Sequence, residues 1–218
     1  AINLINVSVL KRQLKTAMIF FVGTILLRSL FSFDKFLVGE LISLEILGVY
    51  TFYIGLSAAI IALYDAAIGV YILPAIFHFK AEFNSGKLYK YIKKTCLQCF
   101  AIYALALTVS ALFGGLIIDL IGNNLYEEYQ FIFLFVMLSA FLYSLSTVYN
   151  NVIYVFGGYD KWLTIISFTS FLSFLLTAYF AVDSFGVTAI LVASNFAFLI
   201  FFLLKYFLAI YIITQQQK

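Results

Sequence analysis

Arg28 is a strongly basic residue in the middle of a long apolar segment. It lies about 18 Å into the segment from 16 to 38, if that segment is a helix that rises 1.5 Å per residue. In a membrane, an ionisable side chain at that depth costs about 2.5–3.5 kcal/mol and has to face protein or water. A guanidinium that faces a water-filled cavity attracts an anionic group such as a phosphate. The alternative is a structural arginine, paired with carbonyls or with a carboxylate of a neighbouring helix.

Three more ionisable residues lie within apolar segments. Lys35 follows Arg28 by two helical turns and shares nearly the same stripe, whereas Asp34 points about 100° away. Both lie close to the expected outer interface, where a solvated or snorkelled side chain is the alternative to a binding site. Asp65 lies toward the end of the second apolar segment that we expect on the cytoplasmic side, where an interfacial role is the favoured alternative to a binding site.

Polar side chains also recur at helical spacing. In the segment from 129 to 155 they fall within an arc of about 80°, although a lipid-facing surface should carry almost none. They are Ser139, Tyr143, Ser146, Asn150 and Tyr154, flanked by Thr147 and Asn151. Weaker stripes are Tyr50, Tyr53, Ser57 and Tyr64 in the second segment, and Ser167, Ser170, Ser173 and Thr177 in the fifth. The first stripe, with its two asparagines, favours a hydrophilic cavity, whereas the stripe in the fifth segment favours ordinary helix packing.

Motifs of soluble enzymes are absent from the sequence. It contains no phosphate-binding loop, no dinucleotide fingerprint and no nucleophile elbow, so we do not expect an enzyme. Cys96 and Cys99 lie one helical turn apart, but a closed zinc site needs four ligands and no second pair exists. We therefore expect no metal, no cofactor and no nucleic-acid partner.

The composition determines which elements position these residues. Of the 218 residues, 65% are hydrophobic and only 11% are charged, against roughly 25% charged in a typical soluble domain. The apolar runs are continuous and long, which excludes the alternating strands of a membrane barrel. We expect an all-α integral membrane protein, a bundle of about six transmembrane helices that forms a single lobe over 1–218. The predicted helices are about 16–38, 46–71, 96–121, 129–155, 162–182 and 186–209.

The basic residues sort to one side of the predicted membrane when the loops are assigned alternately to its two sides. That side holds Lys11, Arg12, Lys15, Lys80, Lys87, Lys90, Lys93, Lys94, Lys161, Lys205 and Lys218, with the acids Glu82 and Asp160. The other side holds Glu40, Glu45, Asp119, Glu127, Glu128 and Asp183 without a cation. Because short basic loops stay in the cytoplasm, we expect a multi-pass protein with both termini cytoplasmic.

The basic stretch after the second predicted helix has two interpretations. Apolar character runs from 46 to 79, well beyond the roughly 20 residues that one crossing needs, and Pro74 is expected to mark the exit of the helix. From Phe79 to Thr95 the chain is then a connector. It begins either with an amphipathic segment over Phe79 to Phe83, whose lysines face lipid headgroups, or with a solvated basic loop.

Several short motifs follow one another in an order known from a transporter superfamily. They are Asp34-Lys35-Phe36-Leu37-Val38-Gly39, Leu47-Gly48-Val49-Tyr50, Leu73-Pro74-Ala75, Gly122 to Tyr126 and Phe185-Gly186-Val187. In this order the chain resembles the C-terminal half of polysaccharide and O-antigen flippases, in the superfamily that includes multidrug exporters of the MATE type. The sequence departs from the family pattern at Thr188-Ala189, where a second glycine is usual.

The resemblance implies one lobe of a two-lobe, MATE-like transporter in the bacterial cytoplasmic (inner) membrane. Because the chain begins Ala1-Ile2-Asn3, we expect it to be a fragment whose partner is the missing N-terminal lobe of the same protein. The implied function is alternating-access export of a lipid-linked oligosaccharide for cell-surface polysaccharide biosynthesis, including O-antigen and lipopolysaccharide. The implied partners are this anionic lipid-linked glycan and membrane lipids.

The resemblance also assigns roles to the candidate residues. Arg28 and Lys35 would hold the anionic group, and Tyr50, Tyr143 and Asn150 would offer hydrogen bonds to sugar hydroxyls. Asp34 or Asp65 would couple transport to an ion gradient.

Three alternative functions make different demands on the same residues. An ion-coupled multidrug antiporter would favour cationic substrates, against which Arg28 argues. A membrane enzyme that acts on lipid-linked sugars would need a carboxylate cluster or a large outer loop, and the sequence has neither. A non-transporting assembly component would keep its polar stripes tightly packed and dry.

Overall fold

The computed structural model describes residues 7–82 and 85–215, and both parts are almost entirely helical. The helices are α1 (Val7–Leu30), α2 (Phe33–Leu41), α3 (Leu44–Tyr64), α4 (Val70–Ala81), α5 (Ser85–Ile121), α6 (Asn124–Glu128), α7 (Phe131–Phe156), α8 (Asp160–Phe185) and α9 (Val187–Gln215), with a π-helical turn, Asp65–Gly69, between α3 and α4. Six helical segments of the described residues are long and apolar enough to cross a membrane: Gln13–Leu41, Leu44–Ala81, Gly86–Ile121, Phe131–Phe156, Asp160–Phe185 and Val187–Gln215. The prediction of an all-α membrane protein is confirmed, and the number of candidate spans agrees with the predicted six.

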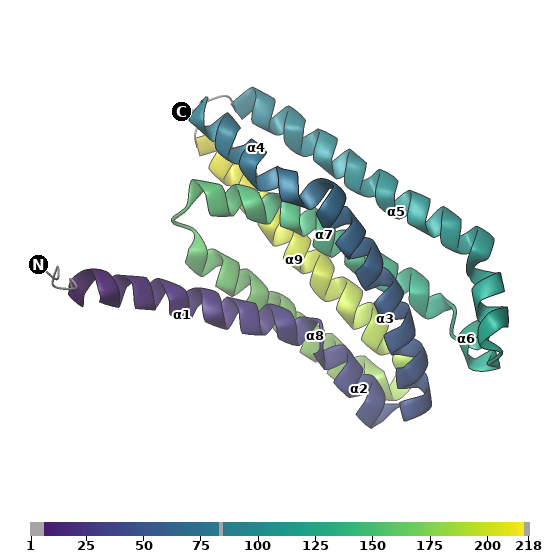
Figure 1. The fold of residues 1–218 in the computed structure, drawn as a ribbon. Helices are drawn as coiled ribbons and strands as arrows, with labels where there is room; N and C mark the ends of the chain where they lie inside the picture. Colours follow the sequence, from purple (N-terminus) through teal and green to yellow (C-terminus); the bar gives the residue numbers. More distant parts are fainter. Residues whose placement is uncertain (1–6, 83–84, 216–218) are drawn as a thin grey trace, which may run out of the picture.

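The helices run between two ends of the bundle, and the charges differ between these ends. Figure 1 shows the two termini, the α4–α5 connection and the α7–α8 connection at one end, and the α2–α3 turn, α6 and the α8–α9 turn at the other. The lysines expected on the basic side lie near the first end, and the acids Glu40, Glu45, Asp119, Glu127, Glu128 and Asp183 lie near the second. Lys218 and the side chain of Arg12 lie outside the described residues.

Lys205 departs from this sorting. It was grouped with the cations of the basic side, but its side chain is buried within α9 and only 5% exposed. Its ammonium lies 3.7 Å from the centroid of the Phe201 ring, and no ion pair joins it to another of the described residues. The aromatic face therefore supplies part of the stabilisation that a carboxylate would otherwise give.

The helices extend beyond the predicted ends, most of all in the stretch expected to be a connector. The stretch from Phe79 to Thr95 is helical up to Ala81 in α4 and again from Ser85 in α5, and Glu82 is the turn residue that ends α4. Leu88, Ile92 and Thr95 are buried there at helical spacing. Charges end an apolar span, but they do not end a helix, because lysines stay solvated while the backbone hydrogen bonds continue.

Pro74 does not end a helix, as the sequence suggested, but lies inside α4. A proline within a helix lacks the amide donor and presses on the carbonyl four residues earlier. The wide π-helical turn Asp65–Gly69 lies immediately before α4, and the chain changes direction between α3 and α4 (Figure 1). The bulge and the proline together replace the predicted exit with a bend.

Helices α7 and α9 form the centre of the bundle. Small residues on α9, namely Ala189, Ala193 and Ala197, recur every four residues and are almost fully buried. Small residues let neighbouring backbones approach closely, which is how helices pack where lipid offers no hydrophobic driving force. Gly186, with a φ of 53°, directly joins α8 to α9 in a left-handed conformation that favours glycine.

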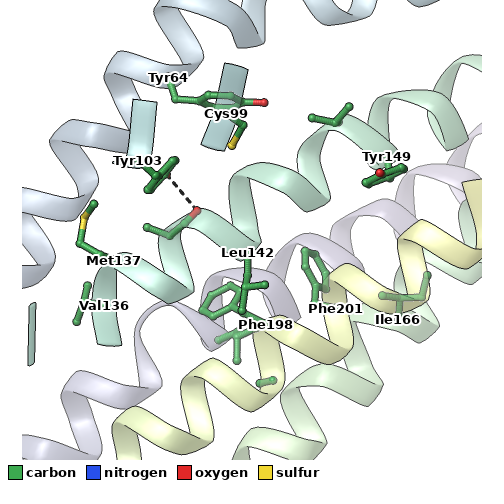
Figure 2. Close-up of a cluster of buried hydrophobic side chains, with 14 of the residues drawn as sticks. Tyr64, Cys99, Tyr103, Val136, Met137, Leu142, Tyr149, Ile166, Phe198 and Phe201 are labelled. Carbon is green, nitrogen blue, oxygen red and sulfur yellow. Dashed lines mark hydrogen bonds between the residues drawn. The ribbon is translucent and has the colours of Figure 1, made fainter. Parts of the chain in front are cut away.

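Helix α5 lies at the edge of the bundle, and Tyr103 ties it to α7. The Tyr103 hydroxyl lies 2.8 Å from the Ser144 hydroxyl and donates to the carbonyl of Ala140 at 3.1 Å. Figure 2 shows this contact among the buried side chains that include Tyr64 and Cys99. The hydrogen bonds hold α5 in register with α7.

Tyr103→Phe is therefore expected to destabilise the bundle by about 1 kcal/mol, because it removes the hydrogen bonds of the Tyr103 hydroxyl that join α5 to α7. Thermal unfolding of the purified protein in detergent measures this change. Tyr89→Phe is the matched control, since Tyr89 lies on the same helix but is 56% exposed. Equal melting temperatures for the two variants would contradict the role of Tyr103.

Candidate functional site

A buried carboxylate lies where the first span is broken. Helix α1 ends at Leu30 and α2 begins at Phe33, which places Asp34 in the first turn of α2. Asp34 is only 7% exposed. Its Oδ2 accepts a hydrogen bond from the Tyr50 hydroxyl of α3 at 2.6 Å, and its Oδ1 accepts one from the amide of Lys35 at 2.7 Å. The two donors compensate for part of the cost of removing the carboxylate from water.

A small cavity of about 80 Å³ lies beside this pair, which is room for a few water molecules. Its polar lining comes from four helices: Asp34 of α2, Tyr50 and Ser57 of α3, Ser139 of α7 and Ser194 of α9. Ser194 lines the same cavity as Tyr50, and its hydroxyl is buried without a hydrogen-bond partner among the described residues. The cavity is therefore a polar point inside an otherwise apolar bundle.

Arg28 lies at the end of α1 and Lys35 in the first turn of α2, on either side of the turn residues Phe31 and Ser32. The Lys35 ammonium donates to the carbonyl of Phe31 at 2.9 Å. That carbonyl loses its helical partner at the break, so Lys35 acts there as a helix C-cap. The Tyr50 hydroxyl also has a partner within the protein, because it donates its hydrogen bond to Asp34.

Arg28 lies in the last turn of α1, roughly midway along the span Gln13–Leu41, and its side chain is exposed. No hydrogen bond or ion pair joins it to another residue of the two described parts. It lies close enough to Tyr143 of α7 to act electrostatically on the phenol.

Tyr143 and Asn150 are half-buried on α7. The Tyr143 ring packs edge-on against Phe31 of the α1–α2 break, with centroids 4.8 Å apart. Ser146, predicted to lie on the same stripe, is buried, and its hydroxyl donates to the carbonyl of Tyr143 at 2.6 Å. The stripe is thus mixed, because part of it is internal helix packing and part remains accessible.

Asp65 lies on the π-helical turn and is exposed. A β-carbon added at Gly69 would stand 2.9 Å from its Oδ1, so the carboxylate folds back over that glycine. Like Arg28, it acts electrostatically on Tyr143. The two charges approach this tyrosine from different spans, and π-turns of this kind are frequent at functional sites.

The described residues contain no group of three His, Cys, Asp or Glu side chains that could hold a metal ion. Cys99 is buried, and the Cys96 sulfur contacts the Tyr149 hydroxyl at 3.5 Å. Cys96 therefore belongs to the packing of α5 against α7, whereas Cys99 lies beside Tyr64 of α3 (Figure 2).

Sequence reasoning missed the Asp34–Tyr50 pair and the buried Lys205. The two members of the pair lie 16 residues apart on either side of a turn, a separation that no helical periodicity connects. Lys205 gave a signal that was misread, because it already fell inside the predicted helix 186–209.

The fold and these side chains define a multi-pass α-helical membrane protein with a polar cavity between α2, α3, α7 and α9. The chain matches no protein-family model, no curated protein and no solved structure. Its function has to be inferred from the side chains themselves.

Tyr50→Phe is expected to destabilise the protein by about 1.5–3 kcal/mol, because a hydrogen bond to a buried carboxylate is lost. In an Asp34→Asn background the same substitution should cost measurably less, since the charged acceptor is already gone. Thermal unfolding in detergent of the wild type, both single variants and the double variant gives this coupling. Tyr53→Phe, which removes a hydroxyl bonded to the carbonyl of Tyr126, is the control and should show no coupling to Asp34→Asn. Additive effects of Tyr50→Phe and Asp34→Asn would contradict the pairing.

Proposed function

We propose that this chain is one lobe of a flippase that exports a lipid-linked oligosaccharide by alternating access. The observation that carries the proposal is Arg28, a guanidinium that is exposed midway along an apolar span and has no acidic partner in the described residues. Lipid cannot be its normal surroundings, because an unpaired charge at that depth faces water or protein. A water-filled cavity between this lobe and a second lobe meets that requirement.

The chemistry of the site favours an anionic headgroup with sugars attached. Arg28 offers a planar set of donors that matches a phosphate. Tyr143 lies within its electrostatic reach, and Asn150 lies two turns further along the same helix. Amide and phenol groups at that spacing suit the hydroxyls of a sugar. No bond is made or broken in this process, so the protein acts as a transporter and not as an enzyme.

The break between α1 and α2 gives the lobe a point at which it can bend. Asp34 sits at that break and is fastened to α3 through Tyr50. A proton or a cation that arrives at the Asp34 carboxylate would compete with the Tyr50 hydroxyl for it. We propose Asp34 as the coupling residue, whereas Asp65 is exposed and less enclosed by protein.

The remaining parts of the proposal follow from the charge distribution and from the resemblance to O-antigen flippases. The lysine-rich end faces the cytoplasm by the positive-inside rule, so both termini lie there. The membrane is the bacterial cytoplasmic membrane. The partner across the cavity is an N-terminal lobe of the same protein.

Arg28→Ala, at unchanged membrane abundance, is expected to abolish export of the lipid-linked oligosaccharide, while Arg28→Lys should retain part of it. The reason is that a lysine keeps the charge but loses the planar two-point contact with phosphate. Surface polysaccharide in complemented cells measures the export. Lys15→Ala is the matched control, because it removes an exposed cation from the lysine-rich end of the same helix. Normal export with Arg28→Ala would remove Arg28 from the mechanism.

A cysteine scan along α7, in a background without Cys96 and Cys99, is expected to distinguish positions that face water from positions that face lipid. Cysteines at Tyr143 and Asn150 should react with a polar maleimide, because both positions would line an aqueous cavity. Cysteines at Leu134 and Leu138, which are 60% and 48% exposed, should react at least about tenfold more slowly, since a thiol in lipid forms little thiolate. Equal reactivity at all four positions would favour a dry assembly lobe over a transporter.

A further inference from the structure

Helix α5 is much longer than a membrane is thick. Its 37 residues extend about 55 Å at 1.5 Å per residue, against about 30 Å for the hydrocarbon core of a bilayer. Its apolar part begins at Cys96, so the turns before that residue project past the hydrocarbon. The projecting part carries Lys87, Lys90, Lys93 and Lys94.

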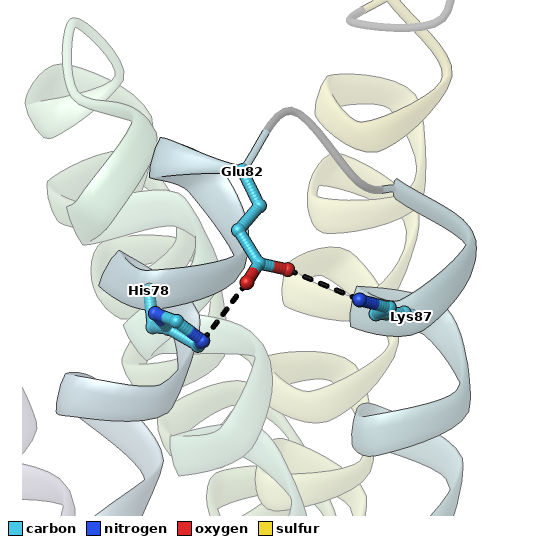
Figure 3. Close-up of polar contacts among 3 residues, drawn as sticks. All are labelled: His78, Glu82 and Lys87. Carbon is cyan, nitrogen blue, oxygen red and sulfur yellow. Dashed lines mark hydrogen bonds and ion pairs between the residues drawn. The ribbon is translucent and has the colours of Figure 1, made fainter.

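These four lysines are not equivalent. Glu82, at the end of α4, pairs with Lys87 at 3.3 Å and with His78 at 3.1 Å (Figure 3). The ammonium groups of Lys90, Lys93 and Lys94, here called the basic stripe, are exposed and form no ion pair with any residue of 7–82 or 85–215. Glu82, the acid next to the basic stripe at the end of α4, is therefore already paired with His78 and Lys87.

The basic stripe lies at the depth of lipid headgroups. Lys93 and Lys94 are about 3–5 Å, and Lys90 about 9 Å, beyond the start of the apolar part at Cys96, if α5 runs close to the membrane normal. The headgroup layer occupies about 5–8 Å on each side of the hydrocarbon, so Lys93 and Lys94 lie within it and Lys90 lies at its outer edge, from where its long side chain reaches back to the phosphates. Exposed tyrosines accompany the stripe, because Tyr71 and Tyr89 are 65% and 56% exposed, and tyrosine is enriched at that level.

The direction of the stripe distinguishes lipid from a soluble partner. Leu88, Ile92 and Thr95 of α5 face the bundle and are buried. Lys90 and Lys94 lie on the opposite face, and that face continues one turn further into Leu97 and then Leu105, which are 67% and 65% exposed. These leucines contact acyl chains in a membrane. The ammonium groups directly above them therefore meet the headgroups of the same lipids.

We propose that the basic stripe binds the phosphate of anionic phospholipids and fixes the α4–α5 hairpin at the membrane surface. The two helices of the hairpin are joined by the Tyr91 hydroxyl of α5, which donates to the carbonyl of Tyr71 of α4 at 3.3 Å. The hairpin is also attached to α7, because the Lys80 ammonium donates to the carbonyl of Val155 at 2.7 Å. Lipid bound at the basic stripe would therefore also hold α4, the end of the span Leu44–Ala81, in place at the membrane surface. This inference does not depend on the transport proposal.

The test titrates the purified full chain in detergent with phosphatidylglycerol or with phosphatidylcholine and counts bound lipids by native mass spectrometry. The wild type is expected to bind phosphatidylglycerol more tightly than phosphatidylcholine. K90Q/K93Q/K94Q should bind phosphatidylglycerol at least about tenfold more weakly, since each lysine near an anionic surface contributes appreciably. Its affinity for phosphatidylcholine should not change.

The control K11Q/K15Q/K161Q removes the same number of exposed cations from the same end of the bundle and should retain wild-type binding. Equal loss in both triple variants, or no loss in the first, would overturn the proposal. Displacement of phosphatidylglycerol by millimolar inorganic pyrophosphate would also overturn it, because the stripe would then recognise a soluble anion. Failure of the Arg28 experiment would leave this outcome unaffected, since the readout involves no transport.

Discussion

The carboxylate of Asp34 is removed from water, and the arrangement around the break in the first span supplies it with protein donors. The break at Phe31 and Ser32 begins a new helix at Phe33, whose first turn offers the amide of Lys35. The α2–α3 turn brings Tyr50 back to the other carboxylate oxygen. The carbonyl freed at the break is met by the Lys35 ammonium. Each of these contacts replaces water that the apolar bundle excludes.

The same exclusion of water explains the two charged ends. The spans Leu44–Ala81 and Gly86–Ile121, of 38 and 36 residues, are longer than one crossing needs, so their surplus turns have to carry polar side chains. In α5 the surplus turns lie at the lysine-rich end. The first span is interrupted by the break at Phe31 and Ser32. The helical turns that project past the hydrocarbon are therefore the ones that carry the charged side chains.

Composition and charge alternation were sufficient to predict six apolar helices, because each crossing requires about 20 apolar residues. The ends of the helices could not be predicted in the same way. A run of lysines ends apolar character in α5, but the helix continues since Leu88 and Ile92 still pack against the bundle. No proline or glycine marks the break at Phe31 and Ser32, so a continuous helix was the natural expectation. At this break the Lys35 ammonium meets the carbonyl of Phe31, a contact that the sequence pattern did not indicate.

Two cations without an acidic partner in the described residues, Arg28 and Lys205, have opposite surroundings. Lys205 is sealed inside the bundle under the ring of Phe201, so no substrate reaches it in this conformation. Arg28 is exposed, and an anion that arrives there has no ion pair to break first. Breaking such a pair would leave a desolvated carboxylate behind and cancel much of the gain. An arginine without a counterion is therefore suited to bind and release an anionic headgroup, whereas a buried lysine is suited only to hold the helices around it.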